Sequence, residues 1–172
     1  PLFPYPTLFR SQDLIDFPVA VPDSDGIPES VRGEMLIAPY NNIDFARALF
    51  LEHSNQIAAI IVEPFQRIIP PAPGFLEALR EECTKHGAIL IFDEVVTGFR
   101  VAYGGAQSLY GVTPDMCTLG KLIGGGLPLA AIAGSADIMS HFDKEKVGAE
   151  RFVMQIGKLS GKPPAAVAGL KT

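Results

Sequence analysis

The chain has 172 residues, of which 48% are apolar and 19% are charged, and its formal net charge is -5. This length is enough for one domain with a sizeable core, and the apolar content excludes a disordered chain. The acidic balance argues against nucleic acid as a partner, and no apolar stretch approaches the ~18 residues that a membrane span needs.

The two ends of the sequence indicate a piece of a larger protein. Residues 1–11, PLFPYPTLFRS, have neither helical nor strand periodicity. Two interpretations stay open for them: a non-native leader of the translated-adapter kind, which we favour, and a native proline-rich arm. Residues 1–11 are therefore treated as a non-native or disordered leader outside the fold. The chain also lacks an initiator Met and stops at AVAGLKT inside an apparent helix.

The first ordered elements are expected after a long irregular stretch. Residues 13–42 are rich in Pro, Gly and Asp, which predicts a meandering surface segment. Asp44 then is the predicted N-cap of a helix in DFARALFLEH. The apolar side of this helix is predicted to hold Phe45, Leu49 and Phe50.

Two apolar runs predict neighbouring parallel strands. The first is IAAIIVEP at 57–64, and the second is ILIFD at 89–93. Such continuous apolar runs are typical of strands that are buried on both faces of a parallel sheet. The amphipathic segment 74–87 between them predicts a covering helix that stops at Gly87. The predicted apolar stripe of this helix is Phe75, Leu76, Leu79 and Cys83.

Two shorter strands are predicted in DMCTLG at 115–120 and LAAIAG at 129–134. The alternation of helices and strands predicts an α/β fold with a mostly parallel sheet. Cys83 and Cys117 are interpreted as free thiols, which favours a reducing, cytoplasmic setting.

Carboxylates stand at the predicted carboxyl ends of the strands, where open α/β sheets bind their ligands. Glu63 ends the first strand, and Asp93 and Glu94 end the second. A lone Asp after a strand most often caps a turn, but in a cleft it can pair with a cation or a protonated ring nitrogen. Glu94 should alternate to the other side of the strand, which argues against a catalytic carboxylate pair.

Lys121 lies just beyond the third predicted strand and before three glycines at 124–126. It is the only charged residue between Asp115 and Asp137, so we expect a desolvated, nucleophilic amine rather than an ordinary solvated lysine. A Walker phosphate loop is excluded because Asp115 and Leu122 occupy the positions that need Gly and Ser or Thr. The histidines are scattered and are predicted to be surface residues: His53, His86 and His141.

A strand-end Asp, an apolar residue two positions later and a sheltered Lys are the parts of a pyridoxal 5′-phosphate (PLP) site. The lysine forms a Schiff base, and the Asp keeps the pyridine nitrogen protonated so that the ring acts as an electron sink. Val95 would cover one ring face, since period two places it on the same strand face as Asp93.

Three motifs occur in order: DEVVTGFR at 93–100, GAQSLYGVTPD at 105–115 and GKLIGGGLP at 120–128. With these motifs, residues 13–172 closely resemble the class III aminotransferases, which are fold-type I PLP enzymes. Within the class they are most similar to the glutamate semialdehyde aminomutase-like members. The resemblance implies that residues 12–172 are part of the large PLP-binding domain, truncated at both ends, with helices on both faces of its sheet.

The resemblance also implies a role for each candidate site residue. Lys121 would hold the cofactor and move a proton at the substrate α-carbon, while Asp93 would pair with the pyridinium nitrogen. Val95 would pack on the ring, Glu63 would lie near cofactor and substrate, and Gln107 would approach the ring oxygen. The complete enzyme is expected to be a cytoplasmic homodimer acting on an amino acid or amino-aldehyde.

Some residues depart from the family pattern. Lys158 replaces a threonine that in the family reaches the phosphate of the partner subunit's cofactor, Lys162 replaces an Asn, and Pro164 stands where a small or aliphatic residue is usual. Whether Lys158 and Lys162 are native or sequence errors stays open. The resemblance also places the phosphate loop and one ring-stacking aromatic before this chain, and the small domain after it. A non-catalytic piece with no activity alone is the alternative to an enzyme, and the choice between transaminase and aminomutase stays open.

Overall fold

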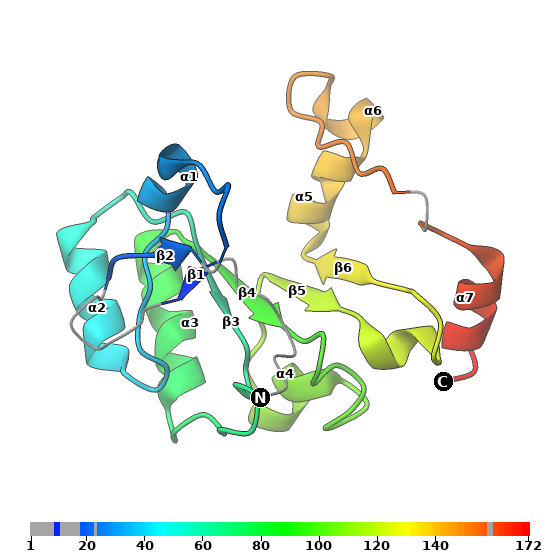
Figure 1. Ribbon diagram of the computed structural model, residues 1–172, viewed down its shortest axis with the longest axis horizontal. Helices are drawn as coiled ribbons and strands as arrows, with labels where there is room; N and C mark the ends of the chain where they lie inside the picture. Colours follow the sequence, from blue (N-terminus) through cyan, green and yellow to red (C-terminus); the bar gives the residue numbers. More distant parts are fainter. Residues whose placement is uncertain (1–8, 11–17, 23, 158–159) are drawn as a thin grey trace.

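The computed structural model describes residues 9–10, 18–22, 24–157 and 160–172 (Figure 1). The strands are β1 Phe9–Arg10, β2 Val21–Pro22, β3 Ala59–Val62, β4 Ile89–Asp93, β5 Met116–Leu119 and β6 Ala131–Gly134. The α-helices are α1 Glu29–Gly33, α2 Ile43–Glu52, α3 Phe75–His86, α4 Gly105–Tyr110, α5 Ala136–Met139, α6 Lys144–Val147 and α7 Pro163–Gly169. Two 3₁₀ helices are η1 Lys121–Gly124 and η2 Ser140–Phe142. Within these residues, every helix is too short or too polar to cross a bilayer.

The main sheet has four strands in the order β3-β4-β5-β6. Strands β3 and β4 are parallel neighbours, with Ile60 opposite Leu90, as the two apolar runs predicted. Strand β5 is parallel to β4, and β6 is antiparallel to β5. The predicted α/β class with a mostly parallel sheet flanked by helices is therefore confirmed.

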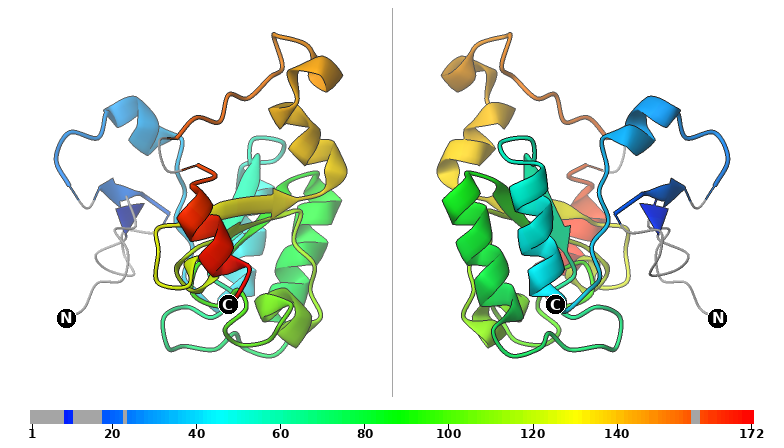
Figure 2. Two further views of the ribbon diagram at one scale, coloured as in Figure 1. Left: turned by 90° about the vertical axis from the view of Figure 1, so that its right-hand side faces the viewer. Right: turned by 90° about the vertical axis from the view of Figure 1, so that its left-hand side faces the viewer.

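Helix α3 connects the first two strands of this sheet and packs beside α2 (Figure 2). Gly74 and Gly87 cap it at its two ends with φ angles of 81° and 68°, a left-handed conformation that favours glycine. The whole predicted apolar stripe is buried: Phe75, Leu76, Leu79 and Cys83. The helix and its stop signal were thus correctly predicted.

The core lies between α2, α3 and one face of the sheet. Leu90 and Phe92 of β4 are fully buried there, together with Phe50 of α2. The prediction that both apolar runs are buried on both faces is wrong for β3, because Ile61 on the other face is 59% exposed. Helices α2 and α3 both cover the sheet face that carries Leu90 and Phe92. The apolar pattern of β3 therefore correctly predicted a strand, but it did not show which face of the strand is covered.

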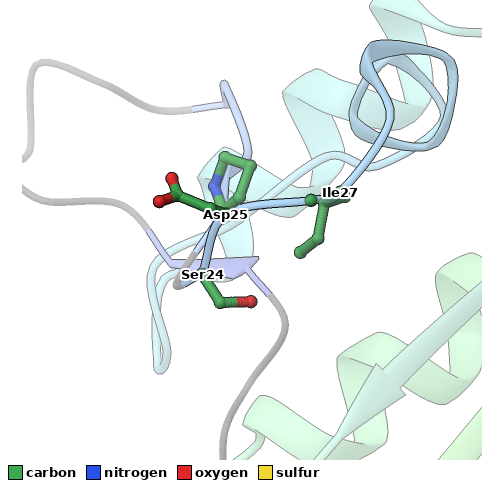
Figure 3. Close-up of a pocket in the computed structure, with 5 residues that line it drawn as sticks. Ser24, Asp25 and Ile27 are labelled. Atoms are coloured by element: carbon green, nitrogen blue, oxygen red, sulfur yellow. The ribbon is translucent and has the colours of Figure 1, made fainter.

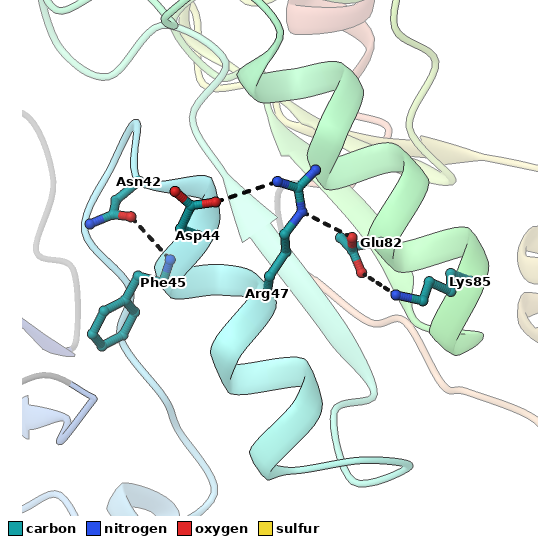
Figure 4. A network of polar contacts seen from close by, with 6 residues as sticks. All are labelled: Asn42, Asp44, Phe45, Arg47, Glu82 and Lys85. Carbon is teal, nitrogen blue, oxygen red and sulfur yellow. Dashed lines mark hydrogen bonds and ion pairs between the residues drawn. The ribbon is translucent and has the colours of Figure 1, made fainter.

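The start of helix α2 differs from the prediction in its capping residue (Figure 4). The N-cap is Asn42, whose Oδ1 accepts a hydrogen bond of 3.0 Å from the backbone N of Phe45. Asp44 lies inside the first turn and pairs with Arg47 at 3.4 Å. Asn and Asp cap helices about equally well, so the sequence alone did not separate the two positions.

Helices α2 and α3 are joined by a polar cluster around the buried Glu82 (Figure 4). Arg47 contacts this carboxylate at 3.1 Å and Lys85 contacts it at 3.4 Å. Burial alone would raise the pKa of Glu82, but the hydrogen bonds from Arg47 and Lys85 outweigh it and hold the pKa below its usual range. His86, predicted to be a surface residue, has a side chain that is only 15% exposed and stacks on Phe50 at 4.8 Å between ring centroids.

The N-terminal segment is only partly described. Phe9 and Arg10, which the prediction left outside the fold, pair antiparallel with Val21 and Pro22, and the rest of residues 1–11 lies outside the described residues. The predicted irregular segment contains the short helix α1, which was missed, and none of its five residues is buried. A shallow pocket follows β2 and is lined by Pro22, Ser24, Asp25, Gly26 and Ile27 (Figure 3).

Candidate cofactor site

The carboxyl ends of two parallel neighbours, β4 and β5, lie side by side and carry the main candidate residues. Asp93 is the last residue of β4 and stands opposite Thr118 of β5. Strand β5 ends at Leu119, and Lys121 follows two positions later. Asp93 and Lys121 thus follow one edge of the sheet, as predicted, and this is the edge where open α/β sheets bind ligands.

The Asp93 carboxylate is half-buried and is held through one of its oxygens. Its Oδ1 accepts hydrogen bonds of 3.1 Å from the Thr118 hydroxyl and 3.1 Å from the backbone N of Val95. From the residues that the structure describes, Oδ2 receives no hydrogen bond. The turn-capping interpretation of Asp93 is therefore confirmed, and one oxygen still remains for a ligand.

Val95 lies in a turn after β4 and does not continue the strand, so the predicted shared strand face with Asp93 is wrong. The hydrogen bond from its backbone to Asp93 bends the chain at this point. Its side chain nevertheless lies against Gly120, where an added Cβ would stand 3.0 Å from Val95 Cγ1. A glycine at 120 thus lets the turn after β4 approach the segment that carries Lys121.

Lys121 begins η1 with a φ of 46°, in the left-handed region that non-glycine residues rarely adopt. A backbone of this kind costs ~1–3 kcal/mol. The side chain is exposed, so the predicted desolvation of Lys121 is wrong. The uncharged stretch around it suggested burial, but Gly125 and Gly126 are themselves exposed and have no side chains to cover a neighbour.

The turn of Lys121 is supported from behind by helix α7. An added Cβ at Gly169 of α7 would collide with the carbonyl oxygen of Ile123 in η1. An added Cβ at Gly125 would likewise stand 3.1 Å from the carbonyl oxygen of Ala168. Two glycines therefore allow α7 and η1 to pack backbone against backbone.

Glu94 points into the protein, as the alternation predicted, and is only 1% exposed. Its carboxylate accepts hydrogen bonds from the Thr97 hydroxyl at 2.9 Å and from the backbone N of Ala106 at 2.6 Å. Gln107 donates twice more, from its backbone N at 3.2 Å and from Nε2 at 3.1 Å. Glu94 therefore anchors α4, a helix that the sequence analysis missed, and does not form a pair with Asp93.

Two further candidates have partners of their own. The side-chain amide of Gln107 is engaged with Glu94, and its predicted approach to a cofactor ring oxygen stays a prediction. Glu63 follows β3, is half-buried and accepts a hydrogen bond of 3.5 Å from the backbone N of Arg67. Its predicted place near cofactor and substrate also stays a prediction.

The residues that depart from the family pattern lie at or just before the start of α7. Lys158 lies outside the described residues. Lys162 is the N-cap of α7 and makes no side-chain capping hydrogen bond with the described part of the chain. Pro164 lies in the first turn of α7, where a proline is well tolerated because its missing N–H needs no partner.

A cavity of about 540 Å³ lies next to the site and is bordered by Glu94, Gln107, Cys117 and Leu119, among others. Among the described residues, neither Asp93 nor Lys121 lines this cavity. A cleft that Asp93 and Lys121 share therefore stays a prediction. Within the described chain, no three His, Cys, Asp or Glu side chains cluster as a metal site would need. Burial raises the pKa of Cys83 to about 11, so this thiol stays neutral and is no competing nucleophile.

These residues fit the parts of a PLP molecule. Asp93 offers an open carboxylate oxygen for a protonated ring nitrogen. Val95 supplies an apolar side chain beside it, packed on Gly120. Lys121 supplies an exposed primary amine after the neighbouring strand. The donor set therefore matches the cofactor that the sequence predicted.

Comparison with known proteins agrees with this chemistry. The model of the family "Aminotransferase class-III" matches residues 22–171. A glutamate-1-semialdehyde 2,1-aminomutase from Nitratidesulfovibrio vulgaris (strain DP4) is 49% identical over 157 residues, which are 90% of this chain and 36% of that protein.

Solved structures give the same result for the fold. An omega-transaminase from Sphaerobacter thermophilus has a TM-score of 0.83 at 41% identity, over 91% of this chain and 36% of its own. A beta-phenylalanine aminotransferase from Variovorax paradoxus has a TM-score of 0.75 at 37% identity, over 86% of this chain and 33% of its own. A transaminase with PLP bound has a TM-score of 0.78 at 29% identity, over 89% of this chain and 37% of its own.

The chain spans about a third of the length of these relatives, 36% for the aminomutase. The family model, in contrast, covers nearly the whole chain. Together with the three motifs and the strand-end geometry, this match establishes that the chain belongs to the class III aminotransferases, a family of PLP-dependent enzymes.

Proposed function

We propose that the protein carrying this chain is a PLP-dependent aminotransferase or aminomutase. The observation that carries the proposal is the pair of residues at the ends of β4 and β5. Asp93 has one oxygen held by two donors, its other oxygen receives no hydrogen bond from the part of the chain that the structure describes, and Lys121 follows the neighbouring parallel strand. When bound, PLP supplies an electron sink for the bonds at the substrate α-carbon.

Each residue of the site has its own task in this proposal. Nζ of Lys121 attaches the cofactor and moves the proton at the substrate α-carbon. The open Oδ2 of Asp93 accepts the hydrogen bond of the ring nitrogen and keeps that nitrogen protonated. Val95 packs on one ring face and excludes water from it. Glu63 and Gln107 are weaker members of the proposed site, since each has a protein partner of its own.

We further propose that the substrate is an amino-aldehyde of the glutamate 1-semialdehyde type. The support is the 49% identity with an aminomutase of that name, against 41% and 37% for two transaminases. An aminomutase returns the amino group to the neighbouring carbon of the same molecule. Incubation with this substrate and no amino acceptor should therefore yield the isomer in which the amino group has moved from carbon 2 to carbon 1. If turnover requires a separate keto acid, the protein is a transaminase instead.

The attachment lysine can be identified chemically. We would express the protein from its complete reading frame, add PLP, reduce with borohydride and locate the modified lysine by peptide mass spectrometry. We expect the label on Lys121, its loss in Lys121→Arg and its persistence in Lys144→Arg, where an exposed lysine of α6 is removed. A label on other lysines, with Lys121 spared in the folded protein, would contradict the assignment.

The alternative is that the 172-residue chain alone has no activity. The exposure of Lys121 and the 36% coverage of the aminomutase favour this for the isolated chain. The same labelling experiment on the isolated chain should then give weak labelling spread over several lysines. Stoichiometric labelling of Lys121 would show that the isolated chain is competent.

The assembly and location of the complete protein are also proposals. A homodimer is expected from the family resemblance, and light scattering of the complete protein would measure its mass. The free thiols Cys83 and Cys117, both buried with raised pKa values, fit a reducing cytoplasm.

A further inference from the structure

We propose that Thr118 is a positioning residue, which orients Asp93 so that its open oxygen faces the ring nitrogen of the cofactor. This inference rests on the proposed function, because it assumes that Asp93 is the partner of that nitrogen. Thr118 belongs to none of the chemical roles assigned above. Its contribution is visible only when β4 and β5 lie side by side.

The contact is a charge-assisted hydrogen bond across the sheet. Thr118 is the register partner of Asp93, and its hydroxyl donates to Oδ1 at 3.1 Å. The backbone N of Val95 donates to the same oxygen at 3.1 Å. Two donors that approach one oxygen from different segments fix the plane of the carboxylate. Oδ2 is thereby held in a defined direction.

The donor itself is rigidly placed. Thr118 pairs with Asp93 of β4 on one side and with Ile132 of β6 on the other. Its carbonyl oxygen also accepts a hydrogen bond of 3.0 Å from the backbone N of Glu94. Threonine is branched at Cβ and is therefore stiff at χ1. The hydroxyl is thus pre-organised, and orienting it requires little further ordering when a ligand binds.

Removing the hydroxyl leaves the carboxylate with a single donor among the described residues. In a Thr118→Val variant Asp93 would keep the hydrogen bond from Val95 but could turn about χ2. A hydrogen bond to an ionised group contributes enough that we expect about tenfold weaker PLP binding. Valine has nearly the same shape as threonine, so the packing between β5 and its neighbours is retained. A merely structural threonine would give no change at the cofactor.

The test reads the protonation state of the ring nitrogen directly. The complete protein would be loaded with PLP that is isotopically labelled in the pyridine nitrogen, and its NMR chemical shift would be measured at one neutral pH. We expect a protonated nitrogen in the unmodified protein and in Thr118→Ser, which keeps a hydroxyl. Thr118→Val should shift the signal towards the neutral form, in the same direction as Asp93→Asn.

A matched control is Thr84→Val on the exposed side of α3, where the hydroxyl donates to the carbonyl of Arg80. This variant should leave the signal unchanged. If Thr118→Val gives the same signal and the same PLP affinity as the unmodified protein, the inference is wrong. If Thr118→Val does not fold, Thr118→Ala provides the same comparison. If the unmodified protein does not hold PLP on Lys121, the proposed function fails, and the inference fails with it.

Discussion

The two sides of strand β4 are built in different ways. On one side, Leu90 and Phe92 are fully buried under α2 and α3, and the Glu82 carboxylate between these helices is paired with Arg47 and Lys85. At the carboxyl edge, Oδ2 of Asp93 receives no hydrogen bond from the described residues, and Lys121 is exposed on a left-handed backbone. The packed side thus contributes most to stability. The residues that can bind a ligand, Asp93 and Lys121, lie at the strand ends, outside the packed core.

This difference predicts that substitutions in the two regions change different quantities. Changes at the edge should therefore alter cofactor chemistry with little effect on unfolding. Changes under the helices should alter the free energy of unfolding instead.

Lys121→Ala should have the largest effect, and this effect should be on chemistry alone. Loss of a positioned acid–base group lowers turnover by about 10²–10⁴-fold, and loss of the attachment amine adds to that. The free energy of unfolding should change by less than about 0.5 kcal/mol, because the substituted side chain is exposed. Turnover of the complete protein and urea unfolding would measure both. Comparable turnover by Lys121→Ala and Lys144→Ala would contradict the separation.

Phe92→Ala should lower the free energy of unfolding by about 3–5 kcal/mol, since it opens a cavity in the core under α3. The control is Ile61→Ala on the exposed face of the neighbouring strand, which should cost less than about 1 kcal/mol. Chemical denaturation of both variants gives the comparison. Equal costs would show that the two faces of the sheet are not packed as described.

The ion pair between Asp115, just before β5, and Arg80 of α3 should make part of the fold's stability sensitive to acid. Burial would raise the pKa of Asp115, but hydrogen bonds from the backbone N of Leu90 and from Arg80, both at 2.7 Å, hold it below its usual range. A lowered pKa stabilises the fold above the ordinary value of about 4 and loses that stabilisation as pH falls through the folded value.

Asp115→Asn should therefore cost about 2 kcal/mol at neutral pH. The difference between the two proteins should stay constant down to about pH 4 and narrow only below it, because only the unmodified carboxylate is then protonated. Unfolding curves at several pH values would measure this. The control Glu77→Gln, an exposed residue in the first turn of α3, should show no such narrowing. A difference that widens in acid would have the wrong sign.

Asn42→Ala should have the smallest effect and should separate the two capping predictions for α2. Loss of the cap bond to Phe45 should cost about 1 kcal/mol. Asp44→Ala should cost less than about 0.5 kcal/mol, since its pair with Arg47 is exposed. Thermal unfolding of both variants decides between them. The reverse order would restore Asp44 as the cap.

The parts of the fold that the sequence predicted are those where a local pattern carries the information. The stripe of α3, its Gly87 stop and the parallel pair β3 and β4 follow from the order of apolar residues and glycines. The positions of Asp93 and Lys121 after neighbouring strands follow from the same topology.

The errors share one physical cause, which is that they depend on tertiary contacts. The exposure of Lys121 depends on whether any segment covers the glycines beside it, and hydropathy does not report this. The turn at Val95 arises because Asp93 accepts its backbone N–H. His86 is half-buried because Phe50, from another helix, stacks on it. The anchoring of α4 by Glu94 likewise joins residues that have no shared local pattern.

A structure of the complete protein with PLP bound tests the central claim most directly. We expect continuous density between Nζ of Lys121 and the cofactor. The ring nitrogen should lie within hydrogen-bond distance of Oδ2 of Asp93, and Oδ1 should keep its bonds to Thr118 and Val95. A cofactor attached to another lysine, or a ring nitrogen that faces a residue other than Asp93, would contradict the account.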